Sequence, residues 1–453
     1  MFDTIAAIAT PRGIGAIGIV RLSGAQTRAV LSRVFFPRNG RSMAEQSGRV
    51  MVYGQVRDRE SRLLDDALCV LFPAPHSYTG EDCAEIHCHG SPIVLDEVLG
   101  ALFDAGARQA QAGEFTKRAF LNGRMDLLQA EAVADLIDAE TAEGAQLAAM
   151  QLSGSLSRAV DAVYDDLMSL VSRFYAVVDY PDEDIADADR ALLSDTLHRS
   201  HRELKTLLAS FARGRVVKHG VPTVLLGKPN VGKSSLLNAL VGYERAIVTD
   251  VAGTTRDTVE EKVRLGRVVL RLTDTAGIRS TDDAVESQGV ARSRAAAQAA
   301  ELALLVLDGS APLTAEDEEA IAAATATQRI VLVNKSDLPM QLDLDALRRR
   351  FGSVYPVSAV TGAGLDALRH AVEALYPAGA AQGQLLTNAR QYDAVRRAAD
   401  AVACAGAALE DGLTPDAVLT DAENALSALG ELNGKSVRDD LVDTIFARFC
   451  VGK

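Results

Sequence analysis

The sequence predicts a multidomain α/β protein: an N-terminal α+β domain, a discontinuous helical domain, and a P-loop nucleotide-binding domain inserted into the helical one. Residues 1–118 show short β-branched runs separated by Gly and Pro, a pattern typical of an α+β domain. Alanine-rich helical periodicity fills residues 119–216 and returns over 379–453. Between them, residues 217–378 alternate strand-like and helix-like runs around a phosphate-loop motif. We therefore expect domain boundaries at these positions.

Three runs of the N-terminal domain are predicted to be strands: Ile14–Leu22, Val50–Val56 and Ala67–Phe72. The first overlaps residues 13–18, which read GIGAIG and match the G-x-G-x-x-G pattern of dinucleotide-binding proteins. That pattern requires a helix directly after the glycines and an acidic residue about 20 positions later. Neither follows here, so we interpret these glycines as part of a bent strand.

The first helical part carries apolar residues such as Leu128 and Leu136 near one face, and Pro181 with the acidic run behind it is expected to end it. A second helix shows apolar spacings of three and four from Leu197 onward. We expect this helix to stop near Gly214, because glycine commonly terminates helices.

A sequence pattern typical of helices returns over residues 385–453. Within it, Thr414 and Pro415 resemble the cap and first residue of a helix. Helices therefore stand on both sides of the predicted nucleotide-binding domain. We expect the two helical parts to pack together, with the nucleotide-binding domain as an insertion between them.

The phosphate-loop motif lies at residues 227–234, which read GKPNVGKS and satisfy every constrained position of G-x-x-x-x-G-K-[ST]. A strand-like run precedes the motif and a helix-like run follows it, as the motif requires. Backbone N–H groups of such a loop bind phosphate oxygens, Lys233 would neutralise β- and γ-phosphate charge, and Ser234 would reach Mg²⁺.

Residues 334–337 read NKSD and select the base. The carboxylate of Asp337 can only accept hydrogen bonds, and guanine offers two adjacent donors on its N1/N2 edge. Adenine lacks this pair and would leave the charge unpaired, which discriminates strongly. Ser358 and Ala359 follow the last predicted strand and are placed to support the base. These patterns together predict a Ras-like GTP-binding domain.

Two further segments supply parts that a GTP hydrolase needs. Asp274, in the DTAG of 274–277, would hold Mg²⁺ through water, and a threonine of the GTTRD at 253–257 would complete the Mg²⁺ shell. Ile278 occupies the position of the water-orienting glutamine of Ras-like enzymes and can neither donate nor accept. Another group must therefore orient the water that attacks the γ-phosphate. A cation must neutralise the negative charge that develops between the β- and γ-phosphates during hydrolysis. The candidates in this segment are Arg279, Asp282, Asp283 and Glu286, and the residues alone do not choose among them.

Composition narrows the functional classes. The chain has 453 residues, is 48% hydrophobic and carries a formal net charge of −14, which argues against general nucleic-acid affinity. We expect no secretory signal and no membrane insertion, and a cytoplasmic location with reduced thiols.

The cluster of His and Cys at residues 83–89 lacks zinc-finger spacing, and strand alternation would direct His87 and His89 to one face and Cys88 to the other.

With these residues in hand, the chain resembles the tRNA-modification GTPase family called MnmE or TrmE over nearly its full length. The resemblance is carried by the GTPase motifs and by six short segments: DTI at 3–5, RLSG at 21–24, SYTGED at 77–82, HCHG at 87–90, GEFTKRAFLNG at 113–123 and FCVGK at 449–453.

The resemblance implies an N-terminal domain that forms a homodimer and binds a tetrahydrofolate derivative, 5-formyl- or 5,10-methylenetetrahydrofolate. Arg21, Glu85, Arg124 and the terminal Lys453 would line that folate site. The family usually has lysine at the position of Arg124, so the charge is kept with a different donor geometry. Cys450 is either a redox group or nucleophile or part of a structural tail.

The resemblance also implies G domains that pair around K⁺, in the place of an arginine finger. Asn230, Thr249, Val251 and Thr254 would bind K⁺, Ser234 and Thr255 would bind Mg²⁺, and Glu286 would orient water. The expected catalytic residues are Glu286, Lys233, Asp274 and Thr255. The residues expected to contact GTP are Asn230, Val231, Gly232, Lys233, Ser234, Ser235, Thr249, Asp250, Val251, Ala252, Gly253, Thr254, Thr255, Asp274, Thr275, Ala276, Gly277, Asn334, Lys335, Asp337, Ser358 and Ala359.

Members of this family act with a flavoprotein of the MnmG/GidA type, in a heterotetramer or larger assembly, on the wobble uridine of certain tRNAs. The resemblance therefore implies addition of an aminomethyl or carboxymethylaminomethyl group at carbon 5, from a folate one-carbon unit. Two alternatives stay open: a ribosome-assembly GTPase switch, and a folate-dependent one-carbon enzyme that GTP only regulates. A KH domain after the G domain would favour the first alternative. Chemistry at Cys450 would favour the second.

Overall fold

The computed structural model describes residues 3–179, 187–243, 261–273, 300–324, 328–377 and 383–436, and, near the C-terminus, 442, 445–447 and 449–452. Its contacts divide the chain into two compact units. The first unit comprises Met1–Ala134, Gln151–Leu204 and Ala394–Lys453, and the second comprises Asp135–Met150 and Lys205–Asp393. These units cut across the boundaries expected from the sequence, and the predicted domain limits stay a proposal.

The first unit begins with a seven-stranded sheet in the order β3-β4-β5-β6-β2-β1-β7. Its strands are β1 (Ile5–Ile8), β2 (Ile17–Ser23), β3 (Phe35–Pro37), β4 (Val52–Arg57), β5 (Leu63–Phe72), β6 (Cys83–His89) and β7 (Arg108–Gln109). Helices α1 (Thr27–Val34) and α2 (Pro92–Asp104) bury their apolar residues against one face, and a short 3-10 helix covers Met43–Glu45. The three predicted strands correspond to β2, β4 and β5.

Two sequence interpretations are confirmed in this sheet. The glycines of 13–18 lead into β2, a strand that pairs antiparallel with β1 and β6, so no helix follows the G-x-G-x-x-G pattern. Burial alternates along β6: Ile86 and Cys88 are buried, while His87 is only half-buried and His89 is exposed. The cysteine and the histidines therefore lie on opposite faces of the sheet.

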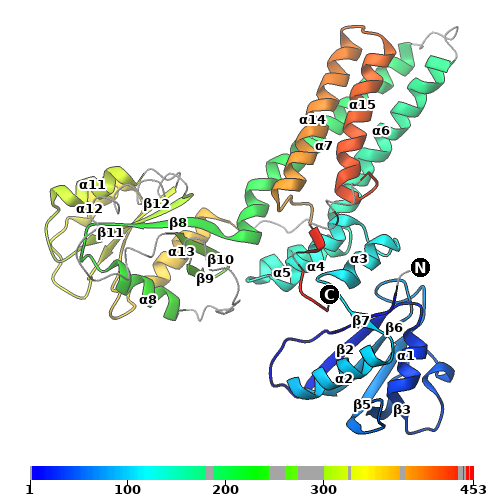
Figure 1. Ribbon diagram of the computed structural model, residues 1–453. Coiled ribbons are helices and arrows are strands. Elements are labelled where there is room, and N and C mark those ends of the chain that lie inside the picture. Colours follow the sequence, from blue (N-terminus) through cyan, green and yellow to red (C-terminus); the bar gives the residue numbers. More distant parts are fainter. Residues whose placement is uncertain are drawn as a thin grey trace, which may run out of the picture. The chain divides into compact units, whose positions relative to one another are not determined.

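Most of the rest of the first unit comes from four long helices, together with the shorter α3 (Glu114–Leu121) and most of α4 (Leu127–Ile137) (Figure 1). The long helices are α6 (Ser155–Asp179), α7 (Asp187–His219), α14 (Ala389–Glu410) and α15 (Pro415–Asn433). Tyr175 of α6 bonds Glu423 of α15, and Arg190 of α7 bonds the Leu409 carbonyl of α14. The helical parts before and after the nucleotide-binding domain therefore pack together, as expected.

The expected end of α7 at Gly214 is wrong, because the helix continues to His219. A side chain at Gly214 would place its Cβ only 2.1 Å from the carbonyl oxygen of Leu386. Glycine at this position lets the backbone at Leu386 approach the helix closely. It does not end the helix. Thr414 and Pro415 do open α15, as the cap residue and first residue of that helix.

The second unit is built on a six-stranded sheet in the order β13-β12-β11-β8-β10-β9. Its strands are β8 (Val221–Leu226), β9 (Glu261–Leu265), β10 (Val268–Thr273), β11 (Leu302–Asp308), β12 (Gln328–Asn334) and β13 (Val354–Pro356). All neighbouring strands run parallel except β9 and β10, which form an antiparallel hairpin.

Helices cover both faces of this sheet, in two separate apolar clusters. Helices α8 (Lys233–Tyr243) and α13 (Leu365–Leu375) pack on one face, and α11 (Ala315–Ala323) and α12 (Leu344–Phe351) pack on the other. This arrangement is a doubly covered α/β sheet, whose ligands bind beyond the carboxyl ends of the parallel strands.

The segment around α5 (Ala142–Leu152) groups largely with the second unit. Glu143 pairs with Arg213 of α7 at 2.9 Å, Asp135 pairs with Lys218 at 2.7 Å, and Gly144 lies close to the Val217 carbonyl. These contacts attach α5 and the end of α4 to the C-terminal part of α7, directly before β8.

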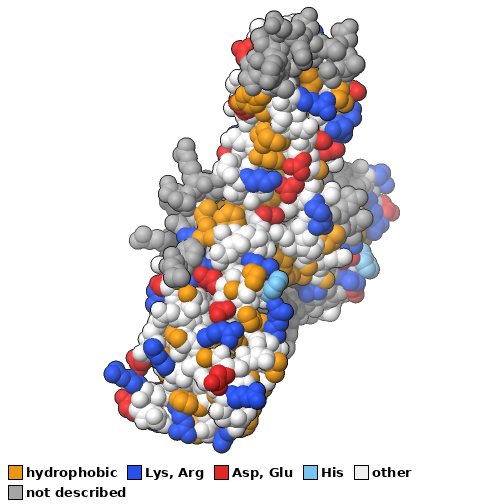
Figure 2. Space-filling view, turned by 90° about the vertical axis from the view of Figure 1, so that its right-hand side faces the viewer, with side chains coloured by type: hydrophobic (Ala, Val, Ile, Leu, Met, Phe, Trp, Pro, Cys, Tyr) orange, Lys and Arg blue, Asp and Glu red, His pale blue; other side chains and the backbone are white. Residues whose placement is uncertain are grey.

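The surface mixes side chains of every type. Figure 2 shows basic, acidic and apolar side chains interspersed over the described part of one face. Among the described helices, none combines the length and the hydropathy that crossing a membrane requires.

Candidate functional site

The phosphate-loop motif connects β8 to α8 and has the backbone conformation that the motif needs. Asn230 has φ +59°, while Gly227 and Gly232 have φ +151° and +93°. A Cβ at Gly227 would lie 2.4 Å from the Val306 carbonyl oxygen, and one at Gly232 would lie 2.4 Å from Asn334 Nδ2. Only glycine fits at either position, so the loop passes tightly between two neighbouring strands.

Lys233 is the first residue of α8, and its ammonium folds back over the loop. Nζ donates to the carbonyl oxygens of Gly227 at 2.6 Å and Lys228 at 2.8 Å. Burial lowers the pKa of the Lys233 ammonium. Ser234 follows on the first turn of the helix, so a cation, a hydroxyl and the N-terminal N–H groups of α8 meet beside the loop, the chemistry of a phosphate site.

The NKSD residues lie in a network that joins the phosphate loop to the segment after β13. The buried Asn334 donates from Nδ2 to the Val231 carbonyl at 2.8 Å and accepts at Oδ1 from the Ala359 N–H at 3.0 Å. Ser358 Oγ donates to Asp337 Oδ1 at 2.6 Å. This orients the exposed carboxylate of Asp337, with acceptor capacity left for a base.

Asp308 belongs to the same network and was not predicted from the sequence. It ends β11 and accepts from Lys335 Nζ at 2.6 Å and from Ser310 Oγ at 2.6 Å. Burial raises the pKa of the Asp308 carboxyl, but the hydrogen bonds from Lys335 and Ser310 outweigh it and the net pKa is lowered. An acidic residue at the end of a fully buried strand was the signal available.

Many predicted GTP-site and metal-site residues lie outside the described residues. They are Thr249, Asp250, Val251, Ala252, Gly253, Thr254, Thr255, Asp274, Thr275, Ala276, Gly277 and Glu286, as are the candidates Arg279, Asp282 and Asp283. Among the described residues, the structure brings together those of 227–234, 334–337 and 358–359.

A second polar site surrounds Arg21 in the N-terminal domain. Arg21 lies opposite Glu85 on β6, and its Nε and Nη2 donate to Glu85 Oε1 at 3.0 and 2.8 Å. The guanidinium carbon lies 5.5 Å from the ring centroid of Tyr78 and 5.8 Å from that of Phe115. Phe115 is fully buried, so these rings support the Arg21 guanidinium, and Arg21 and Glu85 supply the polar groups of this site.

The C-terminal tail reaches this site. Val451 forms an antiparallel bridge with Ala112, and Arg21 Nη1 donates to the Gly452 carbonyl at 3.3 Å. Cys450 is exposed on the tail, and Lys453 lies outside the described residues. The structure therefore favours a tail that threads into the N-terminal domain.

Of the predicted folate residues, Arg21 and Glu85 are in direct contact, whereas Arg124 is not joined to them by a described bond. A Cβ at Gly80 would meet the Arg124 side chain at 3.3 Å, which places Arg124 beside the 77–82 segment. Asn122 also bonds this segment, at the Thr79 carbonyl, at 2.7 Å.

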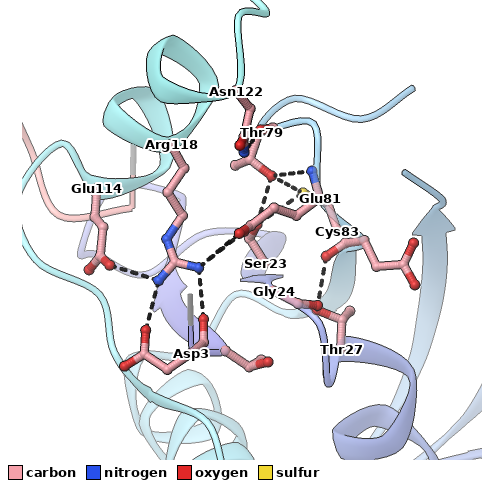
Figure 3. Close-up of polar contacts among 12 residues, drawn as sticks. Asp3, Ser23, Gly24, Thr27, Thr79, Glu81, Cys83, Glu114, Arg118 and Asn122 are labelled. Atoms are coloured by element: carbon pink, nitrogen blue, oxygen red, sulfur yellow. Dashed lines mark hydrogen bonds and ion pairs between the residues drawn. The ribbon is translucent and has the colours of Figure 1, made fainter. Parts of the chain in front are cut away.

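A buried ion network around Arg118 supports the same segment and was not predicted (Figure 3). Arg118 is only 2% exposed, and it donates to Glu81 at 3.0 Å, to Glu114 at 2.9 Å and to both the carboxylate and the carbonyl of Asp3. Glu81 in turn accepts from Ser23 Oγ at 2.7 Å. The i,i+4 spacing of Glu114 and Arg118 in the 113–123 motif was the signal that could have identified it.

Comparisons with known proteins cover the whole chain. Residues 4–124 match the family model for the GTP-binding protein TrmE N-terminus, and residues 127–450 match the model for the MnmE helical domain. Among solved structures, the G domain of FeoB from Methanococcus jannaschii matches 34% of this chain and 96% of its own length, at 25% identity and a TM-score of 0.25. That likeness is too weak to define a fold by itself.

Relatives of the full length are more similar. The chain is 43% identical over 463 residues to the protein named tRNA modification GTPase MnmE of Heliobacterium modesticaldum, covering 100% of this chain and 99% of the relative. It is 45% identical to the proteins of the same name of Roseiflexus sp. and Symbiobacterium thermophilum, with the same coverage. The chain is therefore a GTPase, and it belongs to the MnmE family of tRNA modification GTPases.

Proposed function

We propose that this GTPase works as a homodimer in the modification of tRNA wobble uridines. It would install an aminomethyl or carboxymethylaminomethyl group at carbon 5, together with a flavoprotein of the MnmG/GidA type and a folate one-carbon donor. The observation that carries the proposal is the coexistence of a phosphate loop with a guanine-selecting NKSD segment and a second polar site in one chain that matches tRNA modification GTPases end to end.

Nucleotide binding is assigned to the residues around the phosphate loop. Lys233 would neutralise phosphate charge, the loop N–H groups would bind phosphate oxygens, and Asp337 would accept from the guanine edge. The loop fits a phosphate because its backbone conformation and glycine contacts are those of a tight anion cradle. Mg²⁺ would be held by Ser234 and, outside the described residues, by Thr255 directly and by Asp274 through water. The ion would supply charge neutralisation on the phosphates.

A potassium ion is proposed as the second cation, because Ile278 occupies the position of the water-orienting glutamine. Asn230 is the one proposed ligand among the described residues. It is exposed in the phosphate loop and has a positive φ. Thr249, Val251 and Thr254 would complete the K⁺ set, and Glu286 would orient water.

The folate is assigned to the site of Arg21. A reduced pterin ring presents adjacent N–H donors, for which the Glu85 carboxylate is a suitable acceptor. Arg21 would orient Glu85, and Arg124 and Lys453 are cations suited to the carboxylates of the folate tail. The bound cofactor supplies a one-carbon unit to the uridine.

The experiment that tests the proposed function is mass analysis of wobble nucleosides in a strain lacking the gene. The modified uridines should be absent from the deletion strain and restored by the wild-type gene. Normal modified nucleosides in the deletion strain, accompanied by a ribosome-assembly defect, would favour the alternative of a ribosome-assembly switch.

A further inference from the structure

Asp317 is a buried carboxylate in the first turn of α11, on the sheet face opposite α8. The residue is 1% exposed. Its Oδ2 accepts from the backbone N–H of Thr314 at 2.8 Å and from Thr314 Oγ1 at 2.8 Å, which closes a capping box at the start of the helix.

The same oxygen also accepts from a lysine of the phosphate loop. Lys228 Nζ lies 2.7 Å from Asp317 Oδ2 and 3.2 Å from Thr314 Oγ1. Both side chains are largely removed from water, at 13% exposure for Lys228 and 2% for Asp317. Burial raises the pKa of Asp317, but the hydrogen bonds from Lys228 and Thr314 outweigh it and lower the net pKa, so the pair is ionic.

The backbone of Lys228 continues the connection to the nucleotide site. Its carbonyl oxygen accepts from Lys233 Nζ at 2.8 Å, and Lys228 lies directly after Gly227, whose carbonyl accepts from the same ammonium. The side chain of Lys228 therefore anchors one side of the loop to α11, while its main chain holds the lysine that the motif directs at phosphate.

Helix capping alone does not account for this pair. The cap is complete with Thr314 and Asp317, and a largely buried lysine adds a desolvation cost that a surface lysine avoids. Among the described residues, Asp317 Oδ1 is buried with no hydrogen-bond partner, which adds a burial cost to the ion pair. Buried ion pairs of this kind can instead specify one conformation.

We propose that Asp317 is a positioning residue for GTP binding and hydrolysis. It holds Lys228, and through Lys228 it keeps the phosphate loop in the conformation that presents Lys233 and the loop N–H groups to the β-phosphate. The proposal rests on the assignment of residues 227–234 as the phosphate loop. Because GTP and GDP share the β-phosphate, both nucleotides should depend on the pair.

The test compares Asp317→Asn, Lys228→Met and the double variant with the wild-type full chain. Glu318→Gln is the matched control, because Glu318 is the next residue of α11 and its exposed carboxylate pairs with Arg350 on α12, 2.6 Å away. Dissociation constants for fluorescent GTP and GDP analogues are measured at a temperature where circular dichroism shows every variant folded. KM and kcat for GTP are measured alongside.

Each single variant should weaken both nucleotides by about tenfold and raise KM more than it lowers kcat, while Glu318→Gln should stay within about twofold of wild type. The double variant should bind no more weakly than the weaker single variant, because the second change removes a contact that is already lost. A variant that only loses a helix cap would melt earlier without this change in affinity.

Nucleotide affinity of Asp317→Asn within about twofold of wild type, or single effects that multiply in the double variant, would overturn the proposal. Lys233→Ala separates the two possible failures. If Lys233→Ala still binds nucleotide normally, the phosphate-loop assignment is wrong. If Lys233→Ala loses binding and Asp317→Asn does not, the assignment stands and only the positioning role fails.

Discussion

The Ser358–Asp337 contact connects base recognition to the end of the sheet. Ser358 is fully buried after β13, and its hydroxyl donates to Asp337 Oδ1, so the carboxylate is oriented before any base arrives. A preoriented acceptor loses little conformational entropy on binding, which strengthens selection for guanine.

Changing Asp337 to Asn should therefore reverse the choice of base. The amide puts a donor where guanine also donates, so GTP affinity should fall by about a hundredfold or more. Xanthine carries a carbonyl in place of the guanine amino group, so affinity for xanthosine triphosphate should rise. Titration of both nucleotides against wild type and Asp337→Asn measures this. Unchanged GTP affinity would remove Asp337 from the site.

The Arg118 network gives the N-terminal domain an acid-sensitive component. Burial raises the pKa of Glu114, but hydrogen bonds from Arg108, the Gln111 N–H and Arg118 outweigh it, so its net pKa is lowered. The pKa of Asp3 is lowered chiefly by Arg108. Carboxyls with a lowered folded pKa contribute stability above their unfolded pKa of about 4, and that stability is lost as the pH falls through the folded pKa.

Arg118→Met should lower the free energy of unfolding by about 3 kcal/mol at pH 7, because it removes the buried cation that pairs with Glu81 and Glu114. The difference from wild type should shrink as the pH falls below about 4, where the carboxyls become protonated in both proteins. Urea denaturation of the full chain from pH 7 to pH 3 checks both points. Arg62→Met is the control, since Arg62 forms exposed ion pairs with Asp58 and Glu97. A difference independent of pH would contradict the electrostatic explanation.

Residues in a long motif could be predicted from the sequence, and isolated ones could not. Asn334 and Asp337 belong to a pattern whose chemistry restricts them to the nucleotide. Asp308 and Asp317 are single aspartates at a strand end and a helix start, positions where aspartate commonly caps or stays solvated. Only their contacts, with Lys335 and Lys228, connect them to residues of the predicted GTP site.

At the scale of elements, continuous apolar runs were the most reliable guide to the positions of strands. Glycines were the least reliable guide to where helices end. Strand β11 was predictable because Leu302 to Leu307 are all buried in a continuous apolar run. Gly214 gave a wrong helix end, because the sequence does not distinguish a terminating glycine from one that admits a neighbouring backbone. That distinction depends on a tertiary contact with Leu386, which no local pattern encodes.

The proposed K⁺ site at the phosphate loop predicts that the rate of GTP hydrolysis depends on the monovalent cation. Replacing K⁺ by Na⁺ at equal ionic strength should slow GTP hydrolysis by more than about tenfold, on the scale of a partly lost arginine finger. Asn230→Ala should remove this dependence, and Glu286→Ala should lower kcat while sparing nucleotide affinity. Phosphate release at saturating GTP measures all three. Equal rates in KCl and NaCl would refute the role of the ion.

At the scale of the whole molecule, distant segments of the chain meet at the polar site around Arg21. Arg21 from β2, Glu85 from β6 and Gly452 from the C-terminal tail meet there, although more than four hundred residues separate the first from the last. Composition and periodicity could not predict this meeting. The family resemblance did associate the tail with Arg21, because the FCVGK ending is part of its signature.

The insertion of the GTP-binding unit also has a consequence for function. Helix α7 spans residues of both compact units, since 187–204 belong to the first and 205–219 to the second. A continuous helix can transmit a change at the nucleotide to the helical bundle, and loss of the γ-phosphate reorganises the loops of GTPases. We expect GTP turnover to be coupled to tRNA modification along this route.

The most direct test of that central claim is nucleoside analysis of tRNA from a deletion strain complemented with Lys233→Ala. The variant should bind 5-formyltetrahydrofolate as wild type does in isothermal titration, because Arg21 and Glu85 are untouched, yet it should restore no modified wobble uridine. Full restoration of the modified nucleoside by this GTPase-dead variant would contradict the coupling and reduce GTP to a regulatory ligand.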